Sequence, residues 1–69
     1  MAKYRMDIFK PGRKLSHPVS LWRRRDIYAT DDADATAEAE DLYRTYASQR
    51  TLRGFYLCDR AGRSVHASE

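Results

Sequence analysis

The residue types that could support catalysis gather near the end of the chain, in Cys58, Asp59 and His66. A thiol, a carboxylate and an imidazole can act as nucleophile and general base when they lie within hydrogen-bonding distance. Cys58 and His66 fall on the neighbouring strands of a predicted hairpin, but no spacing pairs them, and His17 stands apart in a predicted loop. We interpret Cys58 as a half-buried structural residue, Asp59 as a turn residue and His66 as a surface residue. The chain is therefore expected to have no catalytic residue and not to be an enzyme.

Ligand-binding patterns are equally sparse. Asp31, Asp32 and Asp34 could begin a calcium loop, but the glycine and the distal glutamate of that motif are missing, so we interpret them as helix-capping residues. The two histidines and the single cysteine have no zinc-ligand spacing. The three scattered glycines form no phosphate-binding loop. We expect no metal, no cofactor and no small-molecule site.

The length of 69 residues indicates one small domain, 1–69, that buries only roughly 60% of its unfolded surface. A single cysteine excludes an internal disulfide. The N-terminal sequence lacks the apolar run of a signal peptide, and no stretch approaches the ~20 apolar residues of a membrane span. These features predict a soluble cytoplasmic protein with no membrane partner.

The clearest periodic segment is a predicted helix over residues 30–50. Its apolar side chains recur at helical spacing and form one stripe, made of Ala35, Ala39, Leu42, Tyr43 and Tyr46. Residues 30–32 are good N-cap types, and the acidic side chains that follow suit the positive end of the helix dipole. We expect this stripe to cover a sheet, most tightly at its alanine-rich N-terminal half.

Alternating apolar residues predict strands over 2–9, 19–29, 55–58 and 63–67. Between the first two, Pro11, Gly12 and Pro18 predict a basic loop over residues 10–18, long enough to be mobile. The turn sequence at 59–62 predicts a tight hairpin in which Gly62 is left-handed. Short uncrossed connections then favour one antiparallel sheet in the order 2-1-3-4, an α+β fold of the type ββαββ. The predicted core is Tyr4, Met6, Ile8, Ile27, Phe55, Leu57 and Val65, under the helix stripe.

Two segments carry a resemblance to known sequences. The helix start, residues 29–35, and the hairpin segment 57–59 with Val65 resemble a set of short uncharacterised bacterial proteins with two strands, a helix and a final hairpin. The resemblance covers about the last two thirds of the chain, and the basic loop departs from it. It implies the ββαββ fold and no particular function or site.

The face of the sheet without the helix is the candidate interaction surface. The predicted strand register places Lys3, Asp7 and Cys58 on it, together with the six residues that we take as the candidate surface, which are Arg5, Trp22, Arg24, Tyr28, Tyr56 and His66. Aromatic and basic residues of this kind are enriched in protein interfaces, which predicts a homodimer or a contact with another protein. They also form stacking platforms for single-stranded nucleic acid, which is the alternative prediction.

Positive charge is concentrated in the N-terminal half. Residues 1–28 contain eight basic and two acidic side chains, a net charge of +6, whereas the remainder contains five basic and eight acidic ones, a net charge of −3. This asymmetry suits either nucleic-acid binding or attraction between the two halves. Successive strand residues point to opposite faces, so Arg23, Arg24 and Arg25 cannot all share one surface without a bulge. We interpret them as charges that protect an edge strand from aggregation.

Overall fold

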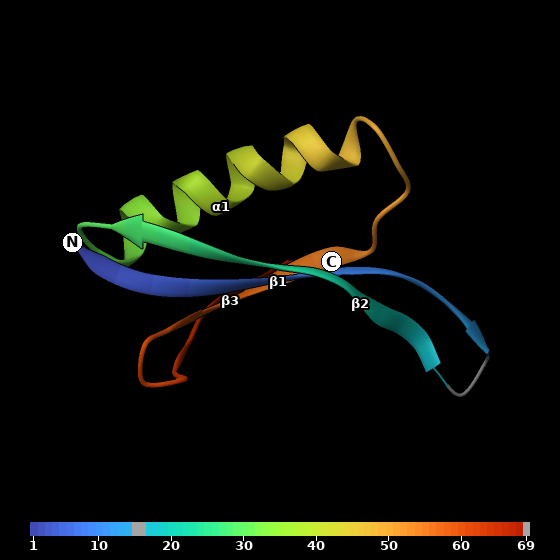
Figure 1. The fold of residues 1–69 in the computed structure, drawn as a ribbon, viewed down its shortest axis with the longest axis horizontal. Helices are drawn as coiled ribbons and strands as arrows, with labels where there is room; N and C mark the ends of the chain where they lie inside the picture. Colours follow the sequence, from blue (N-terminus) through green and yellow to red (C-terminus); the bar gives the residue numbers. More distant parts are fainter. Residues whose placement is uncertain (15–16, 69) are drawn as a thin grey trace.

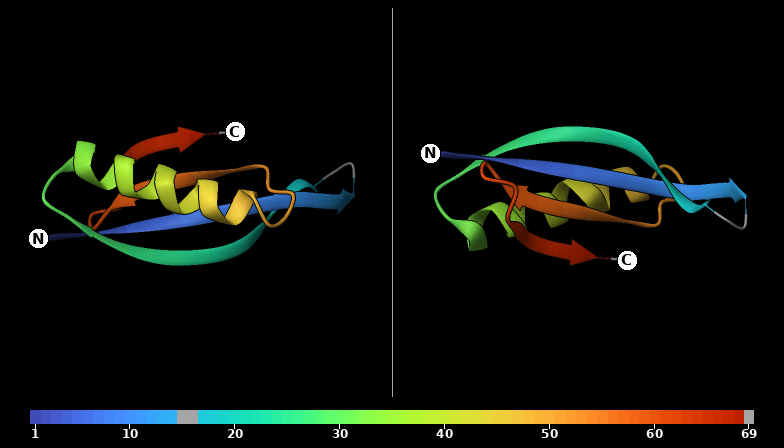
Figure 2. Two further views of the ribbon diagram at one scale, coloured as in Figure 1. Left: turned by 90° about the horizontal axis from the view of Figure 1, so that it is seen from above. Right: turned by 90° about the horizontal axis from the view of Figure 1, so that it is seen from below.

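A computed structural model of the chain describes residues 1–14 and 17–68. In these residues the chain order is β1 (Ala2–Lys14), β2 (His17–Ala29), α1 (Asp32–Ala47), β3 (Gly54–Asp59) and β4 (Ser64–Ser68). The strands pair antiparallel in the order β2-β1-β3-β4. The helix crosses one face of this sheet, and the other face has no helix (Figures 1 and 2). The predicted ββαββ fold and strand order are therefore confirmed.

The first hairpin is longer than predicted. The expected loop over 10–18 is largely strand, because β1 continues to Lys14 and β2 begins at His17; residues 15–16 lie outside the described residues. β1 pairs with β3 only as far as Phe9, and beyond that point its one neighbour is β2. A strand tolerates proline where one of its edges is unpaired, which explains why Pro11 did not end β1. This two-stranded part extends beyond the rest of the sheet (Figure 1). The mobility of the loop stays a prediction.

The helix stripe packs on the sheet as predicted. Ala35 and Ala39 are fully buried, and the larger side chains Leu42, Tyr43 and Tyr46 pack against the core while remaining partly exposed. The axis of α1 is inclined to the sheet and lies closer to it at the alanine-rich end (Figure 1). The core holds every residue predicted for it, with Val65 only partly buried. Within the described residues, no helix is both long and apolar enough to cross a membrane.

The final turn has the predicted geometry. Gly62 has a φ of +88°, in the left-handed region that side chains other than hydrogen disfavour. Its backbone N–H donates to the carbonyl oxygen of Asp59 at 3.0 Å, which closes the turn. One carboxylate oxygen of Asp59 also accepts the backbone N–H groups of Ala61 and Arg63, at 3.0 and 2.9 Å. The aspartate therefore shapes the turn, as the sequence indicated.

Candidate functional site

The helix-free face is defined by the side chains that alternate with the core residues of β1. Tyr4, Met6 and Ile8 are buried on the helix side, so Arg5 and Asp7 point to the other face. Residues directly opposite one another in an antiparallel pair share a face. Among the outward positions of β1, Lys3 pairs with Tyr28, Arg5 pairs with Asp26 and Cys58, and Asp7 pairs with Arg24 and Tyr56. Of the six predicted surface residues, four therefore lie together on this face, namely Arg5, Arg24, Tyr28 and Tyr56.

The predicted position of Trp22 is wrong. Arg23 lies opposite Ile8 and Leu21 lies opposite Phe9, so Trp22 is an extra residue in a β-bulge. Its indole is half-buried on the helix side, where it packs edge-on against Tyr46 of α1 with 5.2 Å between ring centroids. The bulge shifts the alternation at this one point, whereas the register of residues 24–29 agrees with the prediction. Trp22 is therefore not part of the helix-free face.

His66 is also on the helix side. It lies opposite the buried Leu57, and its ring centroid is 5.4 Å from that of Phe55. Its Nε2 is 3.8 Å from a carboxylate oxygen of Glu40 on α1. The cause is again a register shift, because Cys58 pairs with Ser64 and Leu57 pairs with His66, which leaves Val65 as an extra residue. The sheet therefore separates the imidazole of His66 from the thiol of Cys58, which lies opposite Arg5 on the other face.

The charges of the helix-free face are paired with one another. The Nε of Arg24 donates to Asp7 Oδ1 at 2.7 Å, and the Nε of Arg5 lies 3.6 Å from the same oxygen. The Nζ of Lys3 is 3.6 Å from Asp26 Oδ2. Asp7 is only 8% exposed, and a carboxylate so far from water requires such partners. The strand alternation predicted that Asp7 lies on this face, but its burial and its pairing with Arg24 were not predicted.

Apolar side chains lie around this charged centre. Leu21 and Tyr28, near the two ends of β2, are 47% and 54% exposed. Phe9, opposite Leu21, and Tyr56, opposite Asp7, are half-buried, while Cys58 is 1% exposed. The face thus combines exposed apolar groups with internally compensated charges, an arrangement suited to contact with another protein surface.

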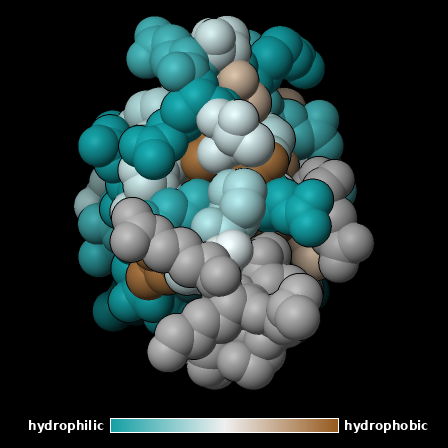
Figure 3. All heavy atoms as spheres, turned by 90° about the vertical axis from the view of Figure 1, so that its right-hand side faces the viewer, coloured by the Kyte–Doolittle hydropathy of each residue, from teal (hydrophilic) through white to brown (hydrophobic). Residues whose placement is uncertain are grey.

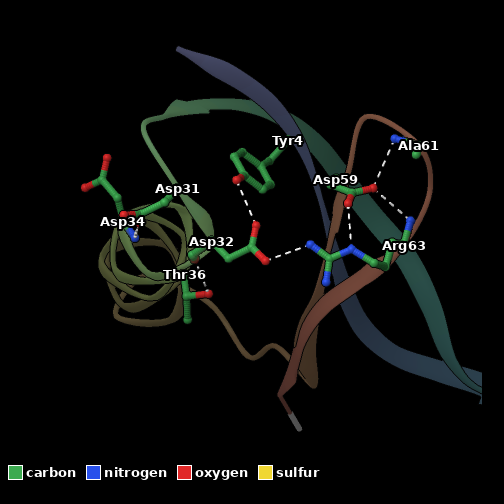
Figure 4. A network of polar contacts seen from close by, with 8 residues as sticks. All are labelled: Tyr4, Asp31, Asp32, Asp34, Thr36, Asp59, Ala61 and Arg63. Carbon is green, nitrogen blue, oxygen red and sulfur yellow. Dashed lines mark hydrogen bonds and ion pairs between the residues drawn. The ribbon is translucent and has the colours of Figure 1, made fainter.

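A second polar cluster joins the start of α1 to β1 and to the final turn (Figure 4). The Tyr4 hydroxyl donates to Asp32 Oδ1 at 2.9 Å, and Arg63 donates to Asp32 Oδ2 at 2.7 Å and to Asp59 Oδ2 at 2.9 Å. The hydrogen bond from Arg63, followed by the one from Tyr4, holds the pKa of Asp32 below its ordinary value. The backbone N–H of Arg63 is the main cause of the lowered pKa of Asp59, and the bond to Asp32 raises the pKa of Tyr4.

This cluster is structural in character. Each of its charged groups already has a partner, and Asp31 beside it caps the helix by accepting the backbone N–H of Asp34 at 2.8 Å. Its bonds connect residues that are far apart in the sequence, such as Tyr4 with Asp32, and so position α1 on the sheet.

Comparisons with known protein families, with curated proteins and with solved structures find no match for this chain.

Proposed function

We propose that the chain is a homodimerisation module whose interface is the helix-free face of the sheet. The observation that carries this proposal is the exposure of Leu21 and Tyr28. Together with Met1, they are the exposed large apolar side chains found among the described residues, and both lie on this one face. A sheet with one covered face gains stability when a second layer buries its other face, and a second copy of the chain supplies a matching surface.

The dimensions of the face limit the interface to a modest size. The Cα atoms extend over 38 × 25 × 15 Å, and the helix and the sheet are stacked along the 25 Å direction, so the helix-free face spans 38 × 15 Å (Figures 1 and 2). A dimer through this face is therefore expected to bury less than the roughly 800 Å² per partner of a standard interface. A contact with a different protein through the same face is the closest variant of this proposal.

The charge pattern also favours a second copy over nucleic acid at this face. Arg5 and Arg24 both lie beside Asp7, and Lys3 is near Asp26, so these three cations and two carboxylates leave only one net positive charge to repel an identical surface. A phosphate backbone would have to draw the two arginines away from Asp7, which would leave a buried carboxylate unpaired. The loss of Trp22 and His66 from this face removes two of the stacking groups that the nucleic-acid alternative required.

Molar mass in solution tests the proposal directly. Light scattering and sedimentation equilibrium over a dilution series should give twice the chain mass at high concentration. Leu21→Glu should weaken the dimer, whereas the matched Ala37→Glu on the exposed side of α1 should leave it unchanged. About half of Leu21 remains to be buried, worth about 1 kcal/mol, and a two-fold interface contains it twice. The dimer should therefore dissociate at a concentration at least about 30-fold higher.

Two results would overturn this proposal. One is a monomeric mass for the unmodified chain at millimolar concentration. The other is an equal shift of the dimer equilibrium by Leu21→Glu and Ala37→Glu, since that would place the interface elsewhere. With a monomeric mass, the homodimer is rejected even if the immobilised chain binds a different protein through the face that contains Tyr28.

A further inference from the structure

Three arginines gather on the helix side of the sheet, near the C-terminal end of α1. Arg23 and Arg25 lie opposite the buried Ile8 and Met6, which places both on this side, while Arg24 between them lies on the other. Arg50 reaches the same place from the loop after α1. Figure 3 shows this end of the molecule, whose upper part is mostly hydrophilic with a few apolar residues in between.

The three guanidinium groups converge on two aromatic rings. Nη1 of Arg25 and Nη1 of Arg23 both donate to the hydroxyl oxygen of Tyr46, at 2.9 and 3.5 Å. The guanidinium carbons of Arg23 and Arg50 lie 4.5 and 4.4 Å from the centroid of the Trp22 ring. The bulge therefore adds the Trp22 ring to the side on which ordinary strand alternation already places Arg23 and Arg25.

No carboxylate of the described residues lies within 4.0 Å of any of these three arginines. Arg24, by contrast, has Asp7 at 2.7 Å. Two cations that share one neutral phenol oxygen repel each other, and the negative end of the helix dipole offsets only part of that repulsion. The cluster therefore has positive charge and N–H donors in excess of its acceptors.

We propose that Arg23, Arg25 and Arg50 form a binding site for a phosphate group. Guanidinium groups present paired N–H donors that match the oxygen atoms of phosphate. Because guanidinium groups already lie over the Trp22 ring, the site recognises the charge of a phosphate and does not need a stacked base. The phosphate can belong to a small free compound or to a single-stranded nucleic-acid backbone. The site lies on the opposite side of the sheet from the proposed dimer interface, so the two proposals stand independently.

Trp22 provides a local probe, since it is the one tryptophan of the chain and contacts two of the arginines. Titration with pyrophosphate, at an ionic strength held constant with sodium chloride, should change its emission in a saturable way. Calorimetry of the same titration records binding even if the emission is silent. The double variant Arg23→Gln/Arg25→Gln should bind pyrophosphate at least about tenfold more weakly, because each arginine supplies charge-assisted hydrogen bonds.

A matched control separates the site from net charge. The double variant Arg44→Gln/Arg60→Gln removes the same number of charges from exposed positions outside the cluster, on α1 and in the final turn. It should retain pyrophosphate binding, with folding verified by circular dichroism. If Arg23→Gln/Arg25→Gln is unfolded, Arg50→Gln in the loop provides the same test. Equal weakening by all variants, or a response to pyrophosphate no larger than that to sodium chloride, would overturn the proposal.

A parallel titration with single-stranded oligothymidylate identifies the source of the phosphate. If the site binds a nucleic-acid backbone, affinity should exceed that for pyrophosphate, and the slope of log K against log salt should become shallower by about one to two in Arg23→Gln/Arg25→Gln. If the oligonucleotide binds no more tightly than pyrophosphate, the site takes a small phosphate compound. If neither pyrophosphate nor the oligonucleotide binds, the proposed site is rejected.

Discussion

Replacing Arg24 should destabilise the fold more than replacing Asp7, although the two side chains form one ion pair. Arg24→Gln leaves the buried Asp7 carboxylate with only the longer 3.6 Å approach of Arg5. Asp7→Asn removes the buried charge itself, and the two arginines, whose side chains are about half exposed, return to water. The asymmetry follows because an unpaired buried charge costs more than an exposed one.

The magnitude follows from the exposure of the pair. A hydrogen bond to a charged group contributes about 1.5–3 kcal/mol, and solvent around the half-exposed Arg24 places this one at the lower end. We expect a loss of about 1–2 kcal/mol for Arg24→Gln and less than about 1 kcal/mol for Asp7→Asn. In a domain of this size, that corresponds to a Tm lowered by about 5–15 °C for Arg24→Gln.

Thermal and urea unfolding followed by far-UV circular dichroism provide the assay. The double variant Asp7→Asn/Arg24→Gln should recover most of the loss seen with Arg24→Gln, because the unpaired carboxylate is gone. Arg24→Lys, which retains the charge, should fall between the unmodified chain and Arg24→Gln. An Asp7→Asn variant as unstable as Arg24→Gln, or losses that simply add in the double variant, would refute this reasoning.

Three further predictions test the helix, the turn and the polar cluster. Leu42→Ala should lower the free energy of unfolding by about 2 kcal/mol, whereas the solvent-side Ala37→Ser should not, and equal melting temperatures would mean that the helix face is misassigned. Gly62→Val should lower the free energy of unfolding in urea by about 1–2 kcal/mol through backbone strain alone, since nothing lies within 4 Å of a Cβ at this position. Gly62→Asn should lose less stability, and an unchanged stability of Gly62→Val would contradict the left-handed turn. Because the pKa of Asp32 is lowered in the fold, its contribution to stability is present at neutral pH and is lost as the pH falls below about 4. Arg63→Gln should therefore reduce the fall of Tm with pH in this acid range. An unchanged dependence of Tm on pH would show that the pairing of Arg63 with Asp32 does not stabilise the fold.

Much of this fold follows from local pattern. The helical period of the stripe from Ala35 to Tyr46 and the two-residue period of β1 are set by backbone geometry, so both elements can be predicted from the sequence. The strand order follows because short connections leave few arrangements of two hairpins and one helix. Gly62 was predictable for a similar reason, since its turn requires a backbone conformation that other residues avoid.

The candidate site depended on contacts that no local pattern contains. A two-residue period assumes an uninterrupted ladder, and the bulges at Trp22 and Val65 break it, which moved Trp22 and His66 to the helix side. Trp22 contacts Tyr46, a residue distant in the sequence, so its side of the sheet is decided by packing against α1. The pairing of Asp7 with Arg24, and the absence of such a partner for Arg23 and Arg25 within the described residues, likewise arise only when the strands are aligned. The sequence alone therefore determined the type and order of the elements but not the length of the first hairpin, whereas tertiary packing decided which charges are neutralised and which remain available to a ligand.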